Sequence, residues 1–264
     1  TLRDLTGGLQ SAGIACEVLD RAQALARIPA LDAAVVGGVL VHGEGHVDNR
    51  RLGRALLAAC QARGVIVVQA SDVAVECDGR RALGVRSDRG FAPAGAVVNA
   101  CGAWAGRLAG VPEGCNPPVV PVKGQMLALA VPEGLVRQVA WVPGAYLVPR
   151  DDGRLLIGAT VESAGFDTRV TAGGLHALLD AALRAAPSLR EFAVTEEWAG
   201  LRPGSPDGLP FIGRSALDGL FVAAGHYRNG ILLAPETARL IADAIERGAP
   251  DVEAFAPGRL ICAV

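Results

Sequence analysis

The stretch DNRRLGRALLAACQARGVIVVQ, residues 48–69, carries a helical pattern that runs directly into a strand-like one. Asp48 is a favourable N-cap, and apolar residues then recur at helical spacing until Gly64, a residue type that commonly ends helices. A run of β-branched residues follows at once, so we expect a strand over 65–69.

The next part of the chain predicts a meander of three short strands. Runs rich in β-forming residues cover 73–77, 82–87 and 94–99. An Asp-Gly pair separates the first two runs, and a turn near Gly90 separates the last two. A helix, a strand and a meander in succession are typical of a mixed α/β (α+β) fold.

The remaining chain also alternates strands with well-marked helices. We expect a separate antiparallel sheet over 119–158, with a hairpin turn at Asp152-Gly153. The other predicted elements are a helix capped by Thr171 and ended by Pro187, strands over 192–201, 209–213 and 219–225, and a last amphipathic helix ended by Gly248.

Composition indicates a folded protein with a small-molecule partner. The 264 residues are 51% hydrophobic and 20% charged, and at about 150 residues per domain they predict about two domains. With 25 Lys and Arg against 27 Asp and Glu, and no long run of either sign, a nucleic-acid or anionic membrane surface has no support. Apolar runs fall short of the roughly 18 residues that cross a bilayer, so we expect a cytoplasmic protein without a membrane span.

The cysteines predict neither a metal site nor a disulfide framework, because no CxxC pair or Cys/His cluster is present. Reduced thiols are the expectation, with Cys101 a small core residue rather than a nucleophile. The six cysteines are Cys16, Cys60, Cys77, Cys101, Cys115 and Cys262.

The segment GEGHVD, residues 43–48, superficially matches the dinucleotide fingerprint GxGxxG. Asp48 stands where that fingerprint has a small residue, and its carboxylate would repel a pyrophosphate. We therefore expect an ordinary loop with an N-cap.

The segment VVNACGAW, residues 97–104, is an apolar strand that ends in small residues. Gly102 would let the backbone approach a ligand closely. A strand followed by a tight turn explains the same pattern, and both interpretations stay open.

In WAGLRPGSPDGLPFIG, residues 198–213, a single Arg202 interrupts an apolar strand end. A partly buried guanidinium needs a partner. That partner is either an acid of the chain, such as Glu196 or Glu197, or the carboxylate of a ligand held by two hydrogen bonds. The residues alone favour neither.

The segment AAGHYRNGILLAP, residues 223–235, leads from a strand through a polar turn into a helix. Free backbone N–H groups at a helix start stabilise negative charge. Asn229 alternatively serves only as the N-cap, and His226 as an ordinary hydrogen-bonded residue.

These last two motifs, together with PVKGQMLAL (121–129) and YLVPRDDGRLLIGAT (146–160), occur in an order that resembles the FAD-dependent D-amino-acid oxidase family, and within it the glycine oxidases of thiamine biosynthesis. NACGAW is similar to part of the family's FAD domain. HVDNRRL, residues 46–52, resembles the point where such chains return from the substrate domain to the FAD domain.

The resemblance implies an incomplete FAD-binding Rossmann-like domain and an antiparallel-sheet substrate domain. The substrate domain would take 1–44 and 121–204, and the remainder of the FAD domain 45–120 and 205–264. The family's N-terminal strand and GxGxxG turn have no counterpart in this sequence, so we expect this chain alone to bind FAD poorly.

The resemblance also implies residue roles. Arg202 would bind the substrate carboxylate, Tyr146 would hydrogen-bond the same group, and Arg228 would lie at the edge of flavin and substrate. FAD would be bound non-covalently, with neither a catalytic acid or base nor a metal. The implied cofactor-binding residues are Val73, whose backbone would contact the adenine end, Gly102, His226, Tyr227, Arg228, Asn229, Gly230, Ile231 and Leu232.

The implied reaction is oxidative deamination of glycine or another small amino acid by dioxygen, giving the 2-oxo acid, ammonia and hydrogen peroxide for thiamine thiazole synthesis. Gly144 stands where family members have a His, and Val161 where a Met can occur. The resemblance therefore defines glycine as the substrate less firmly than it defines the class of amino-acid oxidases. The alternatives are a related flavin dehydrogenase with another acceptor, or a non-catalytic fragment or subunit that needs a partner chain for FAD. Homo-oligomerisation stays open.

Overall fold

The computed structural model describes residues 2–260 and divides into two compact units. The first unit takes the chain up to Asp48, then Gly124–Glu162 and Thr168–Gly200. The second takes Asn49–Lys123, Ser163–Asp167 and the chain from Leu201 onward. The assignment of one unit to the substrate and of the other to the flavin stays a prediction.

The first unit is built on a five-stranded sheet in the order β11-β7-β10-β9-β8. β10 pairs antiparallel with both β7 and β9, and β8 pairs antiparallel with β9. The antiparallel sheet predicted for 119–158 is therefore confirmed, including the hairpin turn before Arg154. The strands are β7 (Val120–Ala130), β8 (Ala140–Val142), β9 (Ala145–Pro149), β10 (Arg154–Gly158) and β11 (Val194–Gly204).

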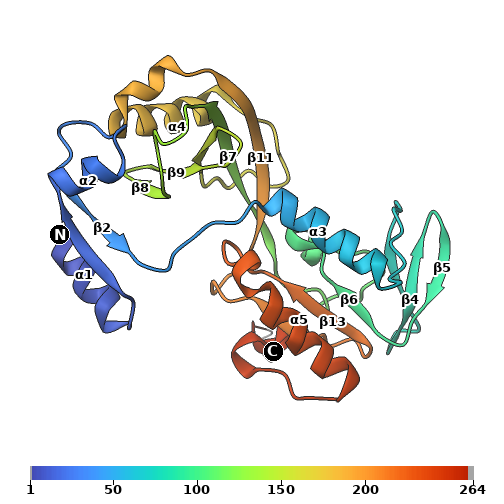
Figure 1. Ribbon diagram of the computed structural model, residues 1–264. Helices are drawn as coiled ribbons and strands as arrows, with labels where there is room; N and C mark the ends of the chain where they lie inside the picture. Colours follow the sequence, from blue (N-terminus) through green and yellow to red (C-terminus); the bar gives the residue numbers. More distant parts are fainter. Residues whose placement is uncertain (1, 261–264) are drawn as a thin grey trace. The chain divides into compact units, whose positions relative to one another are not determined.

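One face of this sheet forms the core of the first unit. Alternation along the strands sends Leu127, Leu147 and Ile157 to the same face, where all three are fully buried. Helix α4 (Ala172–Ala185) covers that face (Figure 1). Its Leu178 belongs to the same core cluster.

The predicted limits of α4 are confirmed. The Thr171 side chain accepts a hydrogen bond from the Gly174 backbone N–H at 3.1 Å, which satisfies one of the free donors of the first turn. The helix ends before Pro187, which opens the 3-10 helix η2 (Pro187–Glu191).

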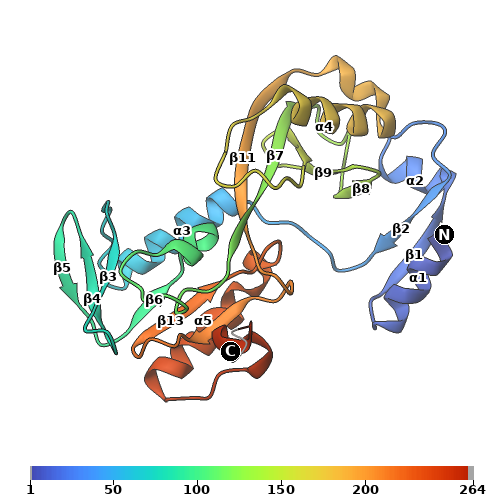
Figure 2. The same ribbon diagram turned by 180° about the vertical axis from the view of Figure 1, so that it is seen from behind.

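The beginning of the first unit pairs two strands between two helices (Figure 2). β1 and β2 are antiparallel. Asp20 and Gln23 form a reciprocal capping box at the second helix. The elements are α1 (Leu2–Ser11), β1 (Cys16–Asp20), α2 (Arg21–Arg27) and β2 (Gly37–Val41).

The second unit contains the meander, with one correction. β3 (Ala74–Cys77), β4 (Ala82–Ser87) and β5 (Gly90–Pro93) form an antiparallel sheet, as Figure 2 shows. The strand predicted at 94–99 is present as the shorter β6 (Val97–Asn99), but its place in the meander is wrong. The third strand of the meander is β5, at residues predicted as a turn, and β6 joins a different sheet, where it pairs parallel with β13 (Leu220–Ala224).

That second sheet has the order β12-β13-β6, and the last helix packs on it. Ile212 and Phe221 of the strands cluster with Ile241 of the helix. The elements are β12 (Phe211–Arg214), β13 (Leu220–Ala224) and α5 (Gly230–Glu246), and the short 3-10 helices of this unit are η1 (Gly102–Arg107), η3 (Glu253–Phe255) and η4 (Pro257–Leu260).

For residues 48–69, at the start of this unit, one predicted element is confirmed and the other prediction is wrong. Helix α3 (Asn49–Ala62) begins directly after Asp48, as predicted, although it buries none of its residues. The strand predicted at 65–69 is wrong, since these residues form no ladder and Ile66 is 87% exposed. Residues with high β propensity form a strand only where a neighbouring strand offers backbone hydrogen bonds. No strand of the described residues pairs with 65–69.

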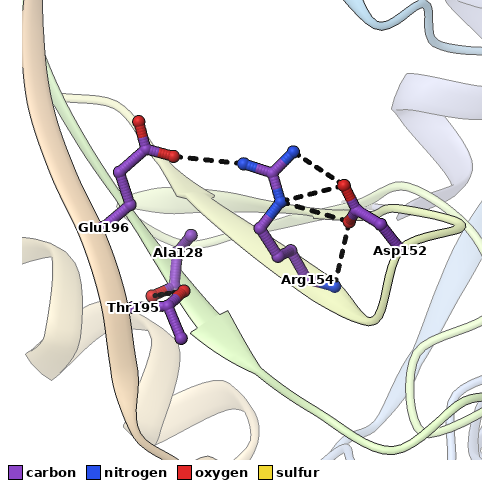
Figure 3. A network of polar contacts seen from close by, with 5 residues as sticks. All are labelled: Ala128, Asp152, Arg154, Thr195 and Glu196. Carbon is purple, nitrogen blue, oxygen red and sulfur yellow. Dashed lines mark hydrogen bonds and ion pairs between the residues drawn. The ribbon is translucent and has the colours of Figure 1, made fainter.

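An arginine joins the hairpin turn of the first unit to β11 (Figure 3). The Arg154 guanidinium donates to both carboxylate oxygens of Asp152, with its shortest bond at 2.8 Å, and to Glu196 at 3.1 Å. These hydrogen bonds raise the pKa of Arg154. Because β7 lies between β10 and β11, the side chain links non-neighbouring strands.

Arg154→Ala is expected to lower the free energy of unfolding by about 1 kcal/mol, since it leaves two partly buried carboxylates without their shared cation. Urea denaturation measures this loss. Arg184→Ala, which removes an exposed pair with Asp180 within α4, is the matched control and should cost less than about 0.5 kcal/mol. Equal losses in the two variants would show that the link between strands contributes nothing.

Candidate functional site

The segment 226–232 comprises a tight turn after β13 and the first residues of α5. Gly225 has φ +80, and a Cβ there would lie 2.9 Å from the Phe211 ring, so only glycine fits without rearrangement. Tyr227 also has a positive φ, of 51°. Its backbone N–H donates to the Pro203 carbonyl at 2.8 Å. The structure thus brings the turn to the end of β11, directly beside Arg202.

Arg202 lies near the end of strand β11 and is partly buried. Its Nη1 donates to the Lys123 carbonyl at 3.3 Å. Of the two acids considered as its ion-pair partner, Glu196 forms an ion pair with Arg154. The ligand-carboxylate interpretation of Arg202 stays a prediction.

His226 is half-buried and lies 2.9 Å from the Thr237 hydroxyl, measured between Nε2 and Oγ1. Burial lowers the pKa of the imidazole, which favours the neutral form. His226, Gly230 and Thr237 line a groove of about 600 Å³ whose other walls are mostly apolar. His226 is therefore a hydrogen-bonded residue, as the simpler interpretation predicted, and also a wall of a cavity.

The start of α5 leaves its backbone donors accessible. Asn229 occupies the N-cap position, as the simpler interpretation predicted, although its side chain makes no capping hydrogen bond. The first turn holds no acidic residue, and Leu232 is 80% exposed. Arg228 is exposed and Ile231 half exposed. This helix start can stabilise an anionic group through its N–H groups and dipole.

Two further predicted cofactor residues belong to the same unit. Val73 directly precedes β3 and is 42% exposed. Gly102 begins η1 with φ +54, and nothing lies within 4 Å of the position that a Cβ would take. The tight turn predicted after the strand is confirmed, and the backbone at Gly102 is open to a ligand.

The placement expected for Cys101 is wrong, because this residue is exposed rather than in the core. Partial desolvation raises the pKa of its thiol, which disfavours the nucleophilic thiolate. The five cysteines of the described part are free thiols, and Cys262 lies outside the described residues.

Tyr146 lies in the first unit, whereas Arg202 lies in the second. The Tyr146 hydroxyl donates to the Met126 sulfur at 3.7 Å. The Trp141 ring lies against the Tyr146 ring, with centroids 5.1 Å apart. Sequence reasoning did not select Met126 or Trp141, because their meeting depends on strand register. The signal available was that Met126 is the one methionine of the sequence.

A polar network in the same unit connects β7 to the start of α4. Gln125, fully buried, donates to the Glu162 carboxylate at 2.8 Å and accepts from the Thr171 backbone N–H at 2.8 Å. The Thr160 hydroxyl bonds the same carboxylate and accepts from the Gln125 N–H. A Cβ at Gly174 would meet the Gln125 amide, so the start of α4 is fitted to this network. Sequence analysis missed it, because its members are far apart in the chain.

Residues 43–48 form a turn and a loop, which confirms the plain-loop interpretation of GEGHVD. Within residues 2–260, no three His, Cys, Asp or Glu side chains are grouped to hold a metal ion. In the same range, every helix is too short or too polar to cross a membrane.

The pH dependence of stability should report on His226. Because its pKa is lowered in the folded state, the unfolded chain takes up a proton first as the pH falls below the ordinary value of 6.5. Stability is then lost from about pH 7 toward pH 5, and His226→Gln should remove that part of the loss. Unfolding in urea at several pH values measures it. His176→Gln, on an exposed position of α4, should retain the wild-type slope, and a loss of slope there would contradict the assignment.

A strand, a tight turn and a helix start without an acidic residue are the elements with which α/β proteins commonly bind nucleotide cofactors. The sequence model described as "FAD dependent oxidoreductase" matches residues 1–244. The chain therefore belongs to this family of FAD-dependent oxidoreductases.

Individual relatives agree with this family. The chain is 42% identical over 241 residues to the bifunctional protein ThiO/ThiG of Synechocystis sp., covering 88% of this chain and 36% of that protein. It is 40% identical over 244 residues to a glycine oxidase of Pseudomonas aeruginosa, covering 90% and 67%. The chain thus spans about a third of the first relative and two thirds of the second.

The fold agrees as well. The crystal structure of glycine oxidase from Geobacillus kaustophilus matches with a TM-score of 0.85 and 36% identity, over 95% of this chain and 69% of that one. The prediction of a mixed α/β (α+β) fold is confirmed.

The residues present fit the redox end of FAD. The first turn of α5 carries no acid that would repel a reduced flavin, and its N–H groups are accessible. Gly102 stands at an open position, and a Cβ at Gly230 would meet only the His226 side chain, at 3.6 Å. These backbone groups and small residues are what a flat aromatic ring system with hydrogen-bonding edges requires.

Proposed function

We propose that the protein containing this chain oxidises glycine or another small amino acid to the 2-oxo acid, ammonia and hydrogen peroxide, with non-covalent FAD and dioxygen as final acceptor. The observation that carries the proposal is the hydrogen bond between Tyr227 and Pro203, at 2.8 Å. This bond holds the end of β11 that carries Arg202 next to the turn that leads into α5, whose N-terminus can stabilise a reduced, anionic flavin.

Arg202 binds the substrate carboxylate through its planar fork of donors, and Tyr146 adds a hydrogen bond to the same group. Arg228 contributes positive charge where flavin and substrate meet. These residues orient the amino acid so that its α-carbon faces the acceptor, which is most of the catalytic work in such a reaction. No side chain of the chain is assigned as a catalytic acid or base.

FAD, when bound, supplies a two-electron acceptor. The residues that would hold it are Val73, Gly102 and the run from His226 to Leu232, in the backbone arrangement described above. The N-terminal dipole of α5 stabilises the negative charge that reduction adds. Neutral His226 lines the groove without adding a competing charge.

The likeness to a protein named ThiO/ThiG supports a place in thiamine thiazole synthesis. The five described cysteines are all free thiols, which supports the cytoplasm as the location. A flavin dehydrogenase with another acceptor and a subunit that borrows its FAD site are the two rival proposals.

The test begins with the visible absorption spectrum of the purified full-length protein, with and without added FAD. Perturbed flavin bands, and peroxide formed from glycine under air, are the expected results. Glycine-dependent bleaching of the bands without peroxide would favour the dehydrogenase. Absence of bound flavin, together with a co-purifying second polypeptide, would favour the subunit and overturn the proposal.

A further inference from the structure

We propose that Met126 is a site of oxidation by hydrogen peroxide, and that its conversion to the sulfoxide releases Tyr146 and weakens substrate binding. Met126 is thereby a positioning residue that makes the activity sensitive to its own product. The effect on activity and the internal source of peroxide rest on the proposed function. The oxidation itself does not, because added peroxide can supply it.

The strand register places Met126 beside the tyrosine. Gly158 of β10 pairs with Tyr146 of β9 on one side and with Met126 of β7 on the other. Trp141 of β8 in turn pairs with Tyr146. Paired residues on neighbouring strands share a face, so these four form one row across the sheet. We call them the tyrosine row.

The tyrosine row lies on the face opposite to the core. Leu127, Leu147 and Ile157, each one residue away from a member of the row, are fully buried on the other side. Trp141 is 64% exposed, and Met126 and Tyr146 are partly exposed. Small oxidants in solution can therefore reach this face.

Gly158 allows the side chains on either side of it to meet. A Cβ at this position would lie 2.7 Å from both Cζ and the hydroxyl of Tyr146, and 2.8 Å from Cε of Met126. With no side chain between them, the tyrosine hydroxyl reaches the thioether and donates to its sulfur at 3.7 Å. The sulfur thus sets the position of the phenol that we assign to the substrate carboxylate.

The chemistry balances with peroxide as the only co-reactant. A sulfur lone pair attacks one oxygen of hydrogen peroxide, the O–O bond breaks, and the other oxygen leaves as water with both hydrogens. The sulfur loses two electrons and the peroxide gains them, which gives methionine sulfoxide. The product replaces a weak acceptor by a strong, bulkier one on a now polar side chain.

The sulfoxide changes what the Tyr146 hydroxyl contacts. The added oxygen occupies the space between sulfur and hydroxyl and competes for the phenol proton. Tyr146 then no longer presents its hydroxyl in the position set by the thioether. Because this group is assigned to binding and not to electron transfer, KM for glycine should rise several-fold while kcat changes less.

The experiment treats the full-length flavoprotein with hydrogen peroxide, then with dithiothreitol, which restores oxidised thiols but leaves methionine sulfoxide unchanged. Trypsin releases the peptide 124–137, which holds Met126. Mass spectrometry should find one added oxygen on this peptide, in step with the rise in KM. Methionine sulfoxide reductase should remove the oxygen and restore KM, which general damage would not allow.

Met126→Leu is the matched variant, similar in volume but without a sulfur. We expect its KM to start above the wild-type value and to stay constant under peroxide. An unmodified peptide 124–137 would overturn the oxidation site, even if the protein has no activity on glycine. An oxidised peptide with unchanged KM in an active enzyme would overturn the positioning role and leave the proposed function intact.

Discussion

Arg202→Ala is expected to raise KM for glycine by about two orders of magnitude in the FAD-loaded full-length enzyme. Alanine removes the guanidinium that we assign to the substrate carboxylate, a charge-assisted interaction whose loss costs about 3 kcal/mol when the site is shielded from water. Steady-state kinetics with peroxide detection measure the change. The flavin spectrum should stay the same, since Arg202 is not assigned to FAD.

Two variants make this result specific. Arg202→Lys keeps the charge but not the planar fork, so its KM should lie between those of wild type and alanine. Arg239→Ala removes an exposed arginine of α5 that pairs with Glu236 and Asp243, and its KM should equal the wild-type value. An unchanged KM in Arg202→Ala would rule out carboxylate binding by this residue.

Arg259→Ala is expected to lower the free energy of unfolding by about 3 kcal/mol, because it removes a nearly buried arginine together with its ion pair and its hydrogen bonds to backbone carbonyls. The Arg259 side chain is 11% exposed and donates to both carboxylate oxygens of Asp207, at 2.8 and 2.9 Å. It also donates to the Pro210 and Leu209 carbonyls and lies 4.1 Å from the centre of the Phe211 ring. One side chain thus attaches η4 to the segment that leads into β12.

The same pair predicts an acid dependence. The Arg259 guanidinium lowers the pKa of Asp207 from its ordinary 3.8 to about 2. The stabilising contribution is fully present above the ordinary value and is lost as the pH falls through about 4 toward about 2. Urea denaturation across this range should show a steeper loss in wild type than in Arg259→Ala.

Arg239→Ala again provides the control, because its ion pairs are exposed and should contribute less than about 0.5 kcal/mol. Asp207→Asn should reproduce most of the acid effect without removing the arginine. If Arg259→Ala and Arg239→Ala destabilise the protein equally, the bonds between Arg259 and Asp207 do not stabilise the attachment of η4 to the segment before β12.

Local patterns predicted the elements whose signals lie within a few residues. Thr171 and Pro187 bracket α4 because capping and the missing proline N–H act on the adjacent turn. The hairpin before Arg154 follows from an Asp-Gly pair for the same reason. Elements that need a distant partner were less predictable. Residues 65–69 have high β propensity but form no strand. β6, predicted as part of the meander, pairs with β13 instead.

The candidate site divides in the same way. The order of the four motifs identified the family, and the turn at 226–232 was visible in the polar residues between a strand and a helix. The bond from Tyr227 to Pro203 could not be read from either motif, since it depends on how β11 and β13 are folded together. Cys101 looked like a core residue by type, yet its position after β6 leaves it exposed.

The sequence by itself determined the family of FAD-dependent oxidoreductases, the mixed fold class and the motifs that bear Arg202, Tyr146 and the start of α5, because residue types and short spacings encode them. Only the tertiary structure decided which side chains meet. The row formed by Tyr146, Gly158 and Met126 exists because three strands pair in one register. A shift of one residue would send each of these side chains to the opposite face of the sheet.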